Sequence, residues 1–289
     1  MSNFIITTDT TSDLPKTYIE EHKLEVFPIY YSLEGVVYGK DVTLTPEDFY
    51  VKMRSGQMPT TMAVNPELAK EVFKKNLDQG LDILHIGFSS ALSGSFNNAM
   101  IAANELKEDY PERKIILIDS LSASLGEGLL VHKALMLKES GKSLDETASW
   151  VEENKLHICH LFTVNDLFHL QRGGRVSKTT AIIGTMINVK PVLHVDNEGR
   201  LIPLQNVRGR KRSLTTLVDH MEVQIKGFED QNDVVFISHG DSLEEAQYVA
   251  SLVKERFGIQ SFLINYVGPA IGAHSGPGTI ALFFMGAER

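Results

Sequence analysis

The sequence contains little cysteine, no excess of positive charge and no long apolar run. Its one cysteine among 289 residues, Cys159, excludes an internal disulfide and a four-cysteine metal site, so we expect a buried thiol in a reducing compartment. Lys and Arg number 28 against 37 Asp and Glu, and the net charge of −9 disfavours a nucleic-acid-binding protein. No apolar run approaches the ~20 residues of a membrane-spanning helix, and the first residues lack a signal-peptide pattern. These absences predict a cytoplasmic protein.

The first half of the chain alternates short apolar runs with helical patterns, which is typical of βαβ units and a mostly parallel sheet. Two helix starts are explicit, because Thr45 and Asn65 are each followed by a proline and then by an acid. Helices on both faces of the sheet would make a doubly wound α/β domain. The predicted strands are Phe4–Thr8, Val26–Tyr31, Ile83–Phe88 and Ile115–Asp119, and the predicted helices lie near residues 45–55, 65–79, 94–108 and 123–140.

The second half has short strands separated by few residues, which predicts a mixed sheet. At roughly 150 residues per domain, the length agrees with two α/β domains, 1–155 and 156–289, with a binding cleft at their interface. The predicted strands lie near 157–163, 189–195, 201–207, 233–238, 259–265 and 279–284, and the predicted helices near 211–226 and 242–256.

Two loops that follow predicted strands carry hydroxyl groups. Ser93, Gly94 and Ser95 open a predicted helix, where free backbone N–H groups and the helix dipole favour an anion such as a carboxylate or phosphate. Thr60 and Thr61 lie before the helix capped by Asn65, and either hydroxyl could donate to the same anion. The alternative for both loops is that these side chains only cap helices.

The segment Gly268–Gly278 holds four glycines and two prolines around His274. This composition predicts a tightly shaped loop rather than a helix or a strand. We expect His274 to be a ligand or a hydrogen-bond relay, with a purely structural histidine as the alternative.

Three further motifs argue against a metal site, a nucleotide-binding loop and a hydrolase nucleophile. Asp9 and Asp13 lack a third ligand for a metal, and Asp13 before Pro15 fits a turn or cap, so no metal is expected. Ser177 stands where a Walker A loop needs glycine before Lys178, which excludes a nucleotide-binding loop of that type. A hydrolase nucleophile elbow around Ser93 fails, because positions 91 and 95 are alanine and serine.

Basic residues gather in two segments of this acidic chain. They indicate either solvated charge or a docking site for an acidic partner or a phosphate group. The residues are Arg172, Arg175, Arg208, Arg210, Lys211 and Arg212.

Taken together, the loops resemble the DegV family, whose characterised members are the fatty-acid-binding subunits of bacterial fatty acid kinase. The resemblance runs nearly from end to end, and several loops in one order are more specific than any single loop. The matching segments are the Asp-Thr-Thr-Ser-Asp-Leu-Pro that starts at Asp9, Pro59-Thr-Thr, Leu92-Ser-Gly-Ser-Phe, Asp119-Ser, Ser124-Leu-Gly-Glu-Gly, Leu170-Gln-Arg-Gly-Gly-Arg-Val, Lys190-Pro-Val-Leu, Val207-Arg-Gly-Arg-Lys and Ala273-His-Ser-Gly-Pro-Gly.

The resemblance implies a two-domain α/β protein that is not itself an enzyme and needs no cofactor. It implies that one long-chain fatty acid, such as palmitate, stearate or oleate, lies between the domains and is presented to a separate kinase subunit, with transient membrane contact. The implied carboxylate ligands are Thr61, Ser93 and His274, and the implied kinase-facing residues are Arg172, Arg175 and Arg208. Where the family often has Ser-Gln after the second-loop motif, this chain has Met62 and Ala63.

Two other functions remain open from the residues alone. A serine hydrolase acting on acyl esters would use Ser93 as nucleophile and His274 as base, with Asp9 or Asp119 orienting the histidine. An interaction protein would use the basic segments on an acidic partner and hold no lipid.

Overall fold

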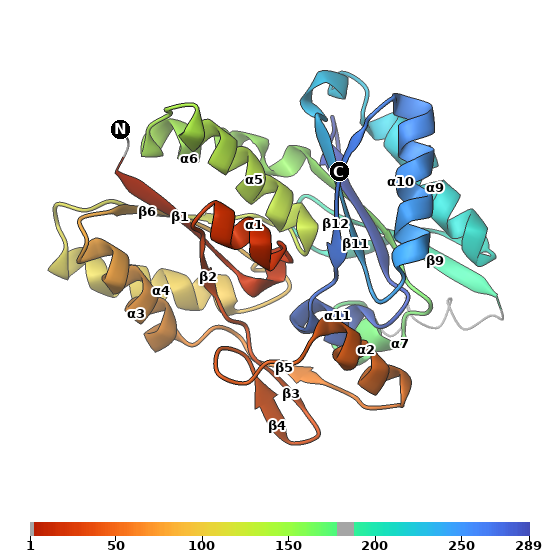
Figure 1. Cartoon of the computed structure of the whole chain (residues 1–289), viewed down its shortest axis with the longest axis horizontal. Coiled ribbons are helices and arrows are strands. Elements are labelled where there is room, and N and C mark those ends of the chain that lie inside the picture. Colours follow the sequence, from red (N-terminus) through yellow and green to blue (C-terminus); the bar gives the residue numbers. More distant parts are fainter. Residues whose placement is uncertain (1–2, 178–187) are drawn as a thin grey trace.

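The computed structural model describes residues 3–177 and 188–289 (Figure 1). Residues 178–187, which include the Lys178 of the Walker A comparison, therefore lie outside the described residues. The N-terminal sheet has the order β2-β1-β6-β7 and is parallel throughout, as predicted. Its strands are β1 (Phe4–Asp9), β2 (Glu25–Phe27), β6 (Asp82–Gly87) and β7 (Ile115–Asp119).

Helices cover both faces of this sheet (Figure 1), which makes the doubly wound layer that the sequence predicts. Helices α3 (Pro66–Leu77) and α4 (Ser95–Asp109) lie on one face, and α5 (Leu125–Glu139) and α6 (Leu144–Asn154) lie on the other. The starts of α3 and α6 follow from the sequence, because Asn65 caps α3 and Ser143 forms a capping box with Glu146. Short helices α1 (Lys16–Glu21) and η1 (Thr10–Ser12) follow β1.

The second sheet is mixed, as predicted, with the order β10-β9-β8-β13-β11-β12. Only β11 and β12 pair in parallel among these described strands. Helices α9 (Arg210–Gln224) and α10 (Leu243–Phe257) cover one face. The strands are β8 (Ile158–Thr163), β9 (Val189–Val195), β10 (Leu201–Arg208), β11 (Val234–His239), β12 (Ser261–Tyr266) and β13 (Ile280–Met285), with η2 (Lys155–His157), α7 (Phe168–Arg172), η3 (Glu229–Gln231) and α11 (Pro269–Ser275) between them. The domain boundary near residue 155 stays a prediction.

Helix α5 packs against strands of both sheets. Every residue from Leu125 to Val131 is buried, and a helix that is buried all round belongs in the interior of a protein. One apolar core therefore runs from Phe4 and Leu84 in the first sheet, past α5, to Phe162 and Phe283 in the second. Gly126 permits this packing, because a Cβ there would overlap the ring of His160.

The predicted strand Val26–Tyr31 is wrong as one element. It divides at Pro28, which has no N–H group to donate to a sheet, and the chain leaves the first sheet there. Strand β3 (Tyr31–Leu33) belongs instead to a small antiparallel sheet with β4 (Val36–Tyr38) and β5 (Thr60–Thr61), beside α2 (Pro46–Arg54). This small sheet fixes Thr61, because Tyr31 pairs with it.

The prediction of a loop over Gly268–Gly278 is also wrong in part. Residues Pro269–Ser275 form α11, since a proline at the first helical position already has the helical φ angle and lacks no needed donor. The helix ends at Gly276, whose φ of 80° favours glycine. His274 therefore lies on the last turn of a helix.

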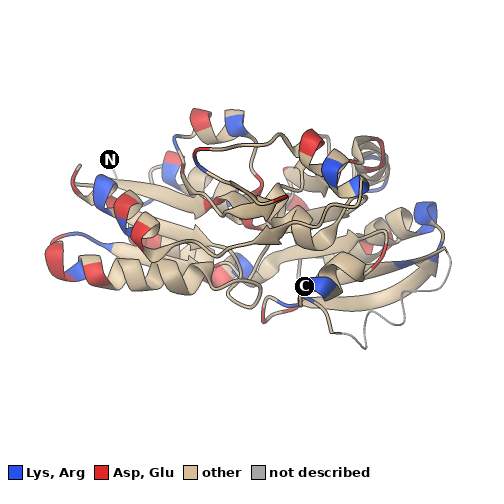
Figure 2. Ribbon diagram, turned by 90° about the horizontal axis from the view of Figure 1, so that it is seen from below, with Lys and Arg blue, Asp and Glu red and all other residues tan. Residues whose placement is uncertain are grey.

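Charged residues lie on the outer helices and loops, with both signs interspersed (Figure 2). Cys159 is fully buried, as predicted, and its Sγ donates to the carbonyl of Glu288 at 3.0 Å. Among the described residues, no helix has the length and apolar character needed to cross a membrane.

Candidate functional site

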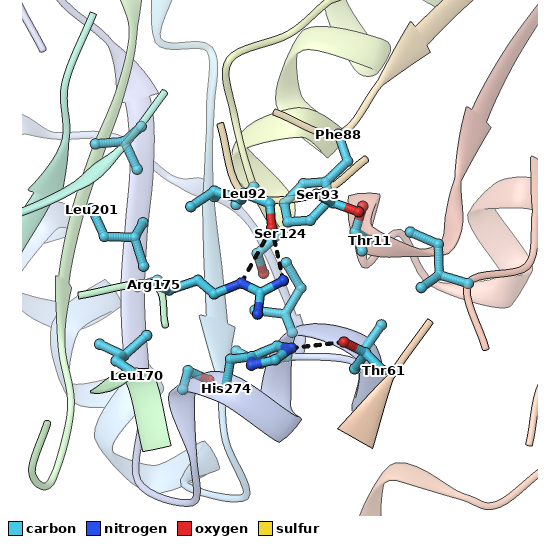
Figure 3. A pocket seen from close by; sticks show the side chains of 18 of the residues that line it. Thr11, Thr61, Phe88, Leu92, Ser93, Ser124, Leu170, Arg175, Leu201 and His274 are labelled. Carbon is cyan, nitrogen blue, oxygen red and sulfur yellow. Dashed lines mark hydrogen bonds between the residues drawn. The ribbon is translucent and has the colours of Figure 1, made fainter. Parts of the chain in front are cut away.

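A pocket lies between the two sheets, with one wall from each (Figure 3). The cavity volume is about 180 Å³, counted as the space that the centre of a water-sized sphere can reach. One water molecule needs roughly 10–15 Å³ on the same scale. Apolar side chains form most of the lining, including Ile29, Phe88 and Leu92 on one side and Phe162, Leu170, Leu201 and Phe283 on the other. The pocket therefore suits an apolar ligand.

The structure brings Thr61, Ser93 and His274 to this one pocket. Thr61 Oγ1 and His274 Nε2 form a hydrogen bond of 2.8 Å across the two halves of the molecule (Figure 3). The rim beside them is open, because Met62 is 40% exposed and Ala63 and Gly94 are also exposed. The polar groups thus lie at the mouth of an otherwise apolar cavity.

Ser93 precedes the first turn of α4 and accepts a hydrogen bond from the Ser95 N–H at 3.2 Å. Its Oγ also lies 2.9 Å from Ser95 Oγ, which in turn accepts from the Val64 N–H at 3.1 Å. These bonds fix the loop after Thr61 against α4. Gly94 lines the pocket too, so the positive end of a 15-residue helix faces the cavity mouth.

Burial lowers the pKa of His274 to about 4, with smaller contributions from the positive charges of Arg175 and Arg172. The imidazole is therefore neutral at pH 7 and acts as a hydrogen-bonding group. Its Nδ1 is buried and has no partner among the described residues. A Cβ on Gly173 would overlap this nitrogen, which explains why glycine follows Arg172 here.

The three arginines of the predicted docking surface lie in different surroundings. Arg175 extends across the pocket, where Nε and Nη2 donate to the carbonyl of Leu92 at 3.2 and 2.9 Å (Figure 3). Arg172 donates to the carbonyls of Pro59 and Ala273 at 2.9 and 3.0 Å, and so joins the threonine loop to α11. Arg208 is exposed at the end of the edge strand β10.

Sequence reasoning missed a buried acidic cluster behind the pocket. Glu127 accepts hydrogen bonds from Thr8 at 2.7 Å and from Thr11 at 3.1 Å, and Asp9 accepts from the Phe88 N–H at 3.1 Å. Burial raises the pKa of both carboxyls, and the charge of Asp9 adds to the shift of Glu127. One acid within the apolar stretch Leu125–Val131 was the available signal.

Asp13 joins this cluster to the second sheet. Ser124 Oγ donates to Asp13 Oδ2 at 2.5 Å and lies 2.7 Å from Ser238 Oγ on β11. Ser124 has φ 56° and ψ −146°, a region that residues other than glycine rarely adopt, so these bonds hold a strained residue at the pocket wall.

Replacing Asp13 by Asn is expected to flatten the pH dependence of stability. Burial raises the pKa of Asp13 from 3.8 to about 8, so the folded protein keeps a proton that the unfolded chain loses above pH 4. The wild-type free energy of unfolding therefore decreases from about pH 4 to pH 8 through this group. Above pH 8 the variant should be more stable by about 1 kcal/mol or more, and the difference should vanish near pH 4.

Urea unfolding of both proteins at pH 5, 7 and 9 measures this effect. Asn tolerates the left-handed φ of 51° at this position, so the backbone need not change. Parallel pH profiles for the two proteins would show that Asp13 ionises normally in the folded state.

The geometry does not form a hydrolytic triad. His274 Nε2 is bonded to Thr61, whereas the Ser93 hydroxyl is bonded to Ser95. Asp9 accepts from Thr11 and Phe88, and Asp119 accepts from the N–H groups of Ser90 and Leu121 at 3.2 and 3.1 Å. Neither aspartate orients His274, so the required chain from acid to base to nucleophile is not assembled.

Fold and site together define a class: a two-domain α/β protein with an apolar pocket between its sheets and, in that pocket, two hydroxyl groups, a neutral imidazole and the Arg175 guanidinium. The DegV family model, described as one of uncharacterised proteins, matches residues 3–287. A DegV domain-containing protein of Clostridium perfringens is 42% identical over 291 residues, covering 100% of this chain and 99% of the relative. The chain belongs to the DegV family.

Solved structures of the family share this fold. A fatty-acid-binding DegV family protein from Thermus thermophilus has a TM-score of 0.87 at 28% identity, over 99% of this chain and 100% of that one. A stearic-acid-binding protein from Eubacterium ventriosum has a TM-score of 0.90 at 25% identity, over 98% of each chain. DegV of Bacillus subtilis, a fatty-acid-binding protein, has a TM-score of 0.84 at 26% identity, over 99% of this chain and 100% of that one.

Proposed function

We propose that this chain binds one long-chain fatty acid between its two sheets and presents the carboxylate to a separate kinase subunit, which makes the acyl phosphate. The observation that carries the proposal is the position of Thr61, Ser93 and His274 at the mouth of an apolar pocket. The fatty acids held by the family members described above support the ligand class.

Hydroxyl groups and the start of α4 suit a carboxylate. They stabilise its charge by hydrogen bonds and by the helix dipole, and the guanidinium of Arg175 lies in the same pocket. Thr61 and Ser93 donate to the carboxylate oxygens, and neutral His274 fixes the orientation of the Thr61 hydroxyl. The tail supplies most of the affinity: at about 0.8 kcal/mol per buried methylene, sixteen carbons contribute on the order of 10 kcal/mol before ordering costs.

The exposed rim suits transfer to a partner. A carboxylate held beside Met62, Ala63 and Gly94 is within reach of a second protein, while the tail stays buried. The partner contacts Arg172, Arg175 and Arg208, and it supplies ATP and the phosphoryl-transfer chemistry. The acyl phosphate then feeds phospholipid synthesis.

Native mass spectrometry of the purified protein, followed by extraction of any ligand, tests the first half of the proposal. One fatty acid per chain supports it, and a protein that stays empty with added fatty acid contradicts it. Incubation of the loaded protein with a bacterial fatty acid kinase subunit and ATP tests the second half, with acyl phosphate trapped by hydroxylamine as the readout.

Removing the ligand is expected to lower the melting temperature. A ligand present at about 100 times its dissociation constant stabilises the folded state by about 2.7 kcal/mol, which corresponds to roughly 5–10 °C for a chain of this size. Scanning calorimetry before and after verified delipidation, with readdition of the fatty acid as the control, measures the change. An unchanged melting temperature would mean that the tail is not part of the core.

A further inference from the structure

The inner end of the pocket is formed by one row of side chains on neighbouring strands. On the face that lines the pocket, β8 and β13 contribute two cross-strand pairs, Phe162 with Ala281 and His160 with Phe283. The next pair along the strands, Ile158 with Met285, does not line the pocket. Along these two strands, the pocket lining therefore ends at His160 and Phe283.

Of the two pairs, His160 with Phe283 is the one farther along the strands from His274. Strand β13 follows α11 directly, so Ala281 comes nearer to His274 along the chain than Phe283 does. With a rise of about 3.4 Å per residue, the pair of His160 and Phe283 lies about 7 Å deeper than the first pair. Both residues are only 2% exposed, in contrast to the open rim at Met62.

His160 is held rigidly in this position. Its Nδ1 bonds to the Ile158 carbonyl at 2.9 Å, and its Nε2 accepts from the Ala123 N–H at 3.4 Å. Its ring meets the edge of Phe283 at a centroid distance of 5.3 Å and lies against Gly126 from the other side. A ring fixed on four sides cannot rotate away from a ligand as a free aliphatic side chain would.

From this geometry we propose that His160 is the end stop of the acyl pocket and sets the longest fatty-acid chain that the protein accepts. The inference rests on the proposed function, because it assigns the tail of the fatty acid to this end. The buried ring leaves no room for methylene groups beyond it. Its polar nitrogen atoms also gain nothing from contact with the apolar terminal methyl group of a fatty acid.

Replacing His160 by Ala is expected to shift binding toward longer saturated acids. Each methylene that enters the opened space gains about four-fold in affinity, which is 0.8 kcal/mol converted at 1.4 kcal/mol per tenfold change. The larger side chain of a His160→Phe variant should shift binding in the opposite direction. The measurement is displacement of a fluorescent fatty acid by saturated acids of graded length, with folding checked by circular dichroism.

His85 provides a matched control. It is also fully buried, stacks on Phe27 at 4.8 Å and bonds to Thr7 at 3.0 Å, but it lies under α3 in the first sheet and does not line the pocket. A His85→Ala variant should lose stability without changing the order of preferred chain lengths.

The outcomes separate this inference from the proposed function. A wild-type protein that binds no fatty acid of any length overturns both. A wild-type protein that binds, with an unchanged length preference in the His160 variants or an equal change in His85→Ala, overturns the end stop alone. If His160→Ala does not fold, the direction of the shift in His160→Phe decides.

Discussion

The double variant Ser93→Ala, Thr61→Val is expected to bind long-chain fatty acids about 100-fold more weakly, or worse. A hydrogen bond to a charged group contributes about 1.5–3 kcal/mol, and the variant removes two donors from the carboxylate. At 1.4 kcal/mol per tenfold change, the loss of both gives at least two orders of magnitude. The apolar pocket is untouched, so the free protein should fold and the length preference should persist.

Isothermal titration with palmitate measures the loss, and Thr60→Val is the matched control. Thr60 and Thr61 are neighbours on β5 and point to opposite faces, with Thr60 exposed and Thr61 in the pocket. The control should bind as the wild type does. If the double variant binds with wild-type affinity, the carboxylate lies elsewhere and the proposed orientation of the ligand is wrong.

Replacing Arg289 by Ala is expected to lower the free energy of unfolding by about 3 kcal/mol or more. The guanidinium is buried and donates to backbone carbonyls of Ile158, Leu121 and Lys155 at 3.0, 2.6 and 2.6 Å, and to Ser122 Oγ at 2.9 Å. Removing it leaves several buried acceptors without a donor, and each costs about 1–3 kcal/mol.

Urea unfolding at neutral pH measures this change. Arg200→Ala is the control, because Arg200 is 62% exposed and, within residues 3–177 and 188–289, its side chain pairs with Glu198 alone, an interaction worth about 0–1 kcal/mol. A similar small loss in both variants would contradict the argument that Arg289 fastens the loop before α5 to the start of β8.

Most of the fold could be predicted from the alternation of apolar runs and helical patterns along the chain. Alternating strands and amphipathic helices predicted the parallel first sheet, and short strands separated by few residues predicted the mixed second one, because both patterns are local. The break at Pro28 and helix α11 were missed although each has a local proline signal. The contacts that place them come from residues distant in sequence, because β3 pairs with β5 and Gly272 packs against Tyr50.

The candidate site likewise contains some residues that the sequence predicts and others that it does not. Ser93 and Thr61 were predictable because each follows a strand or precedes a capped helix, and loops at strand ends meet at one edge of a sheet. The roles of Glu127 and Arg289 were not predictable, because partners such as Thr8 and Leu121 lie more than 100 residues away in the sequence. The role of a buried ionisable side chain can be assigned only when those partners are known.

The shared position of α5 bears on how the molecule unfolds. Because one apolar core contains this helix and strands of both sheets, neither sheet keeps a complete core when the other opens. We therefore expect the two domains, one for each sheet, to unfold as a single cooperative unit. A ligand placed between the sheets strengthens the contact on which both depend, so filling the pocket protects the amide groups of the whole chain from exchange rather than those of one domain.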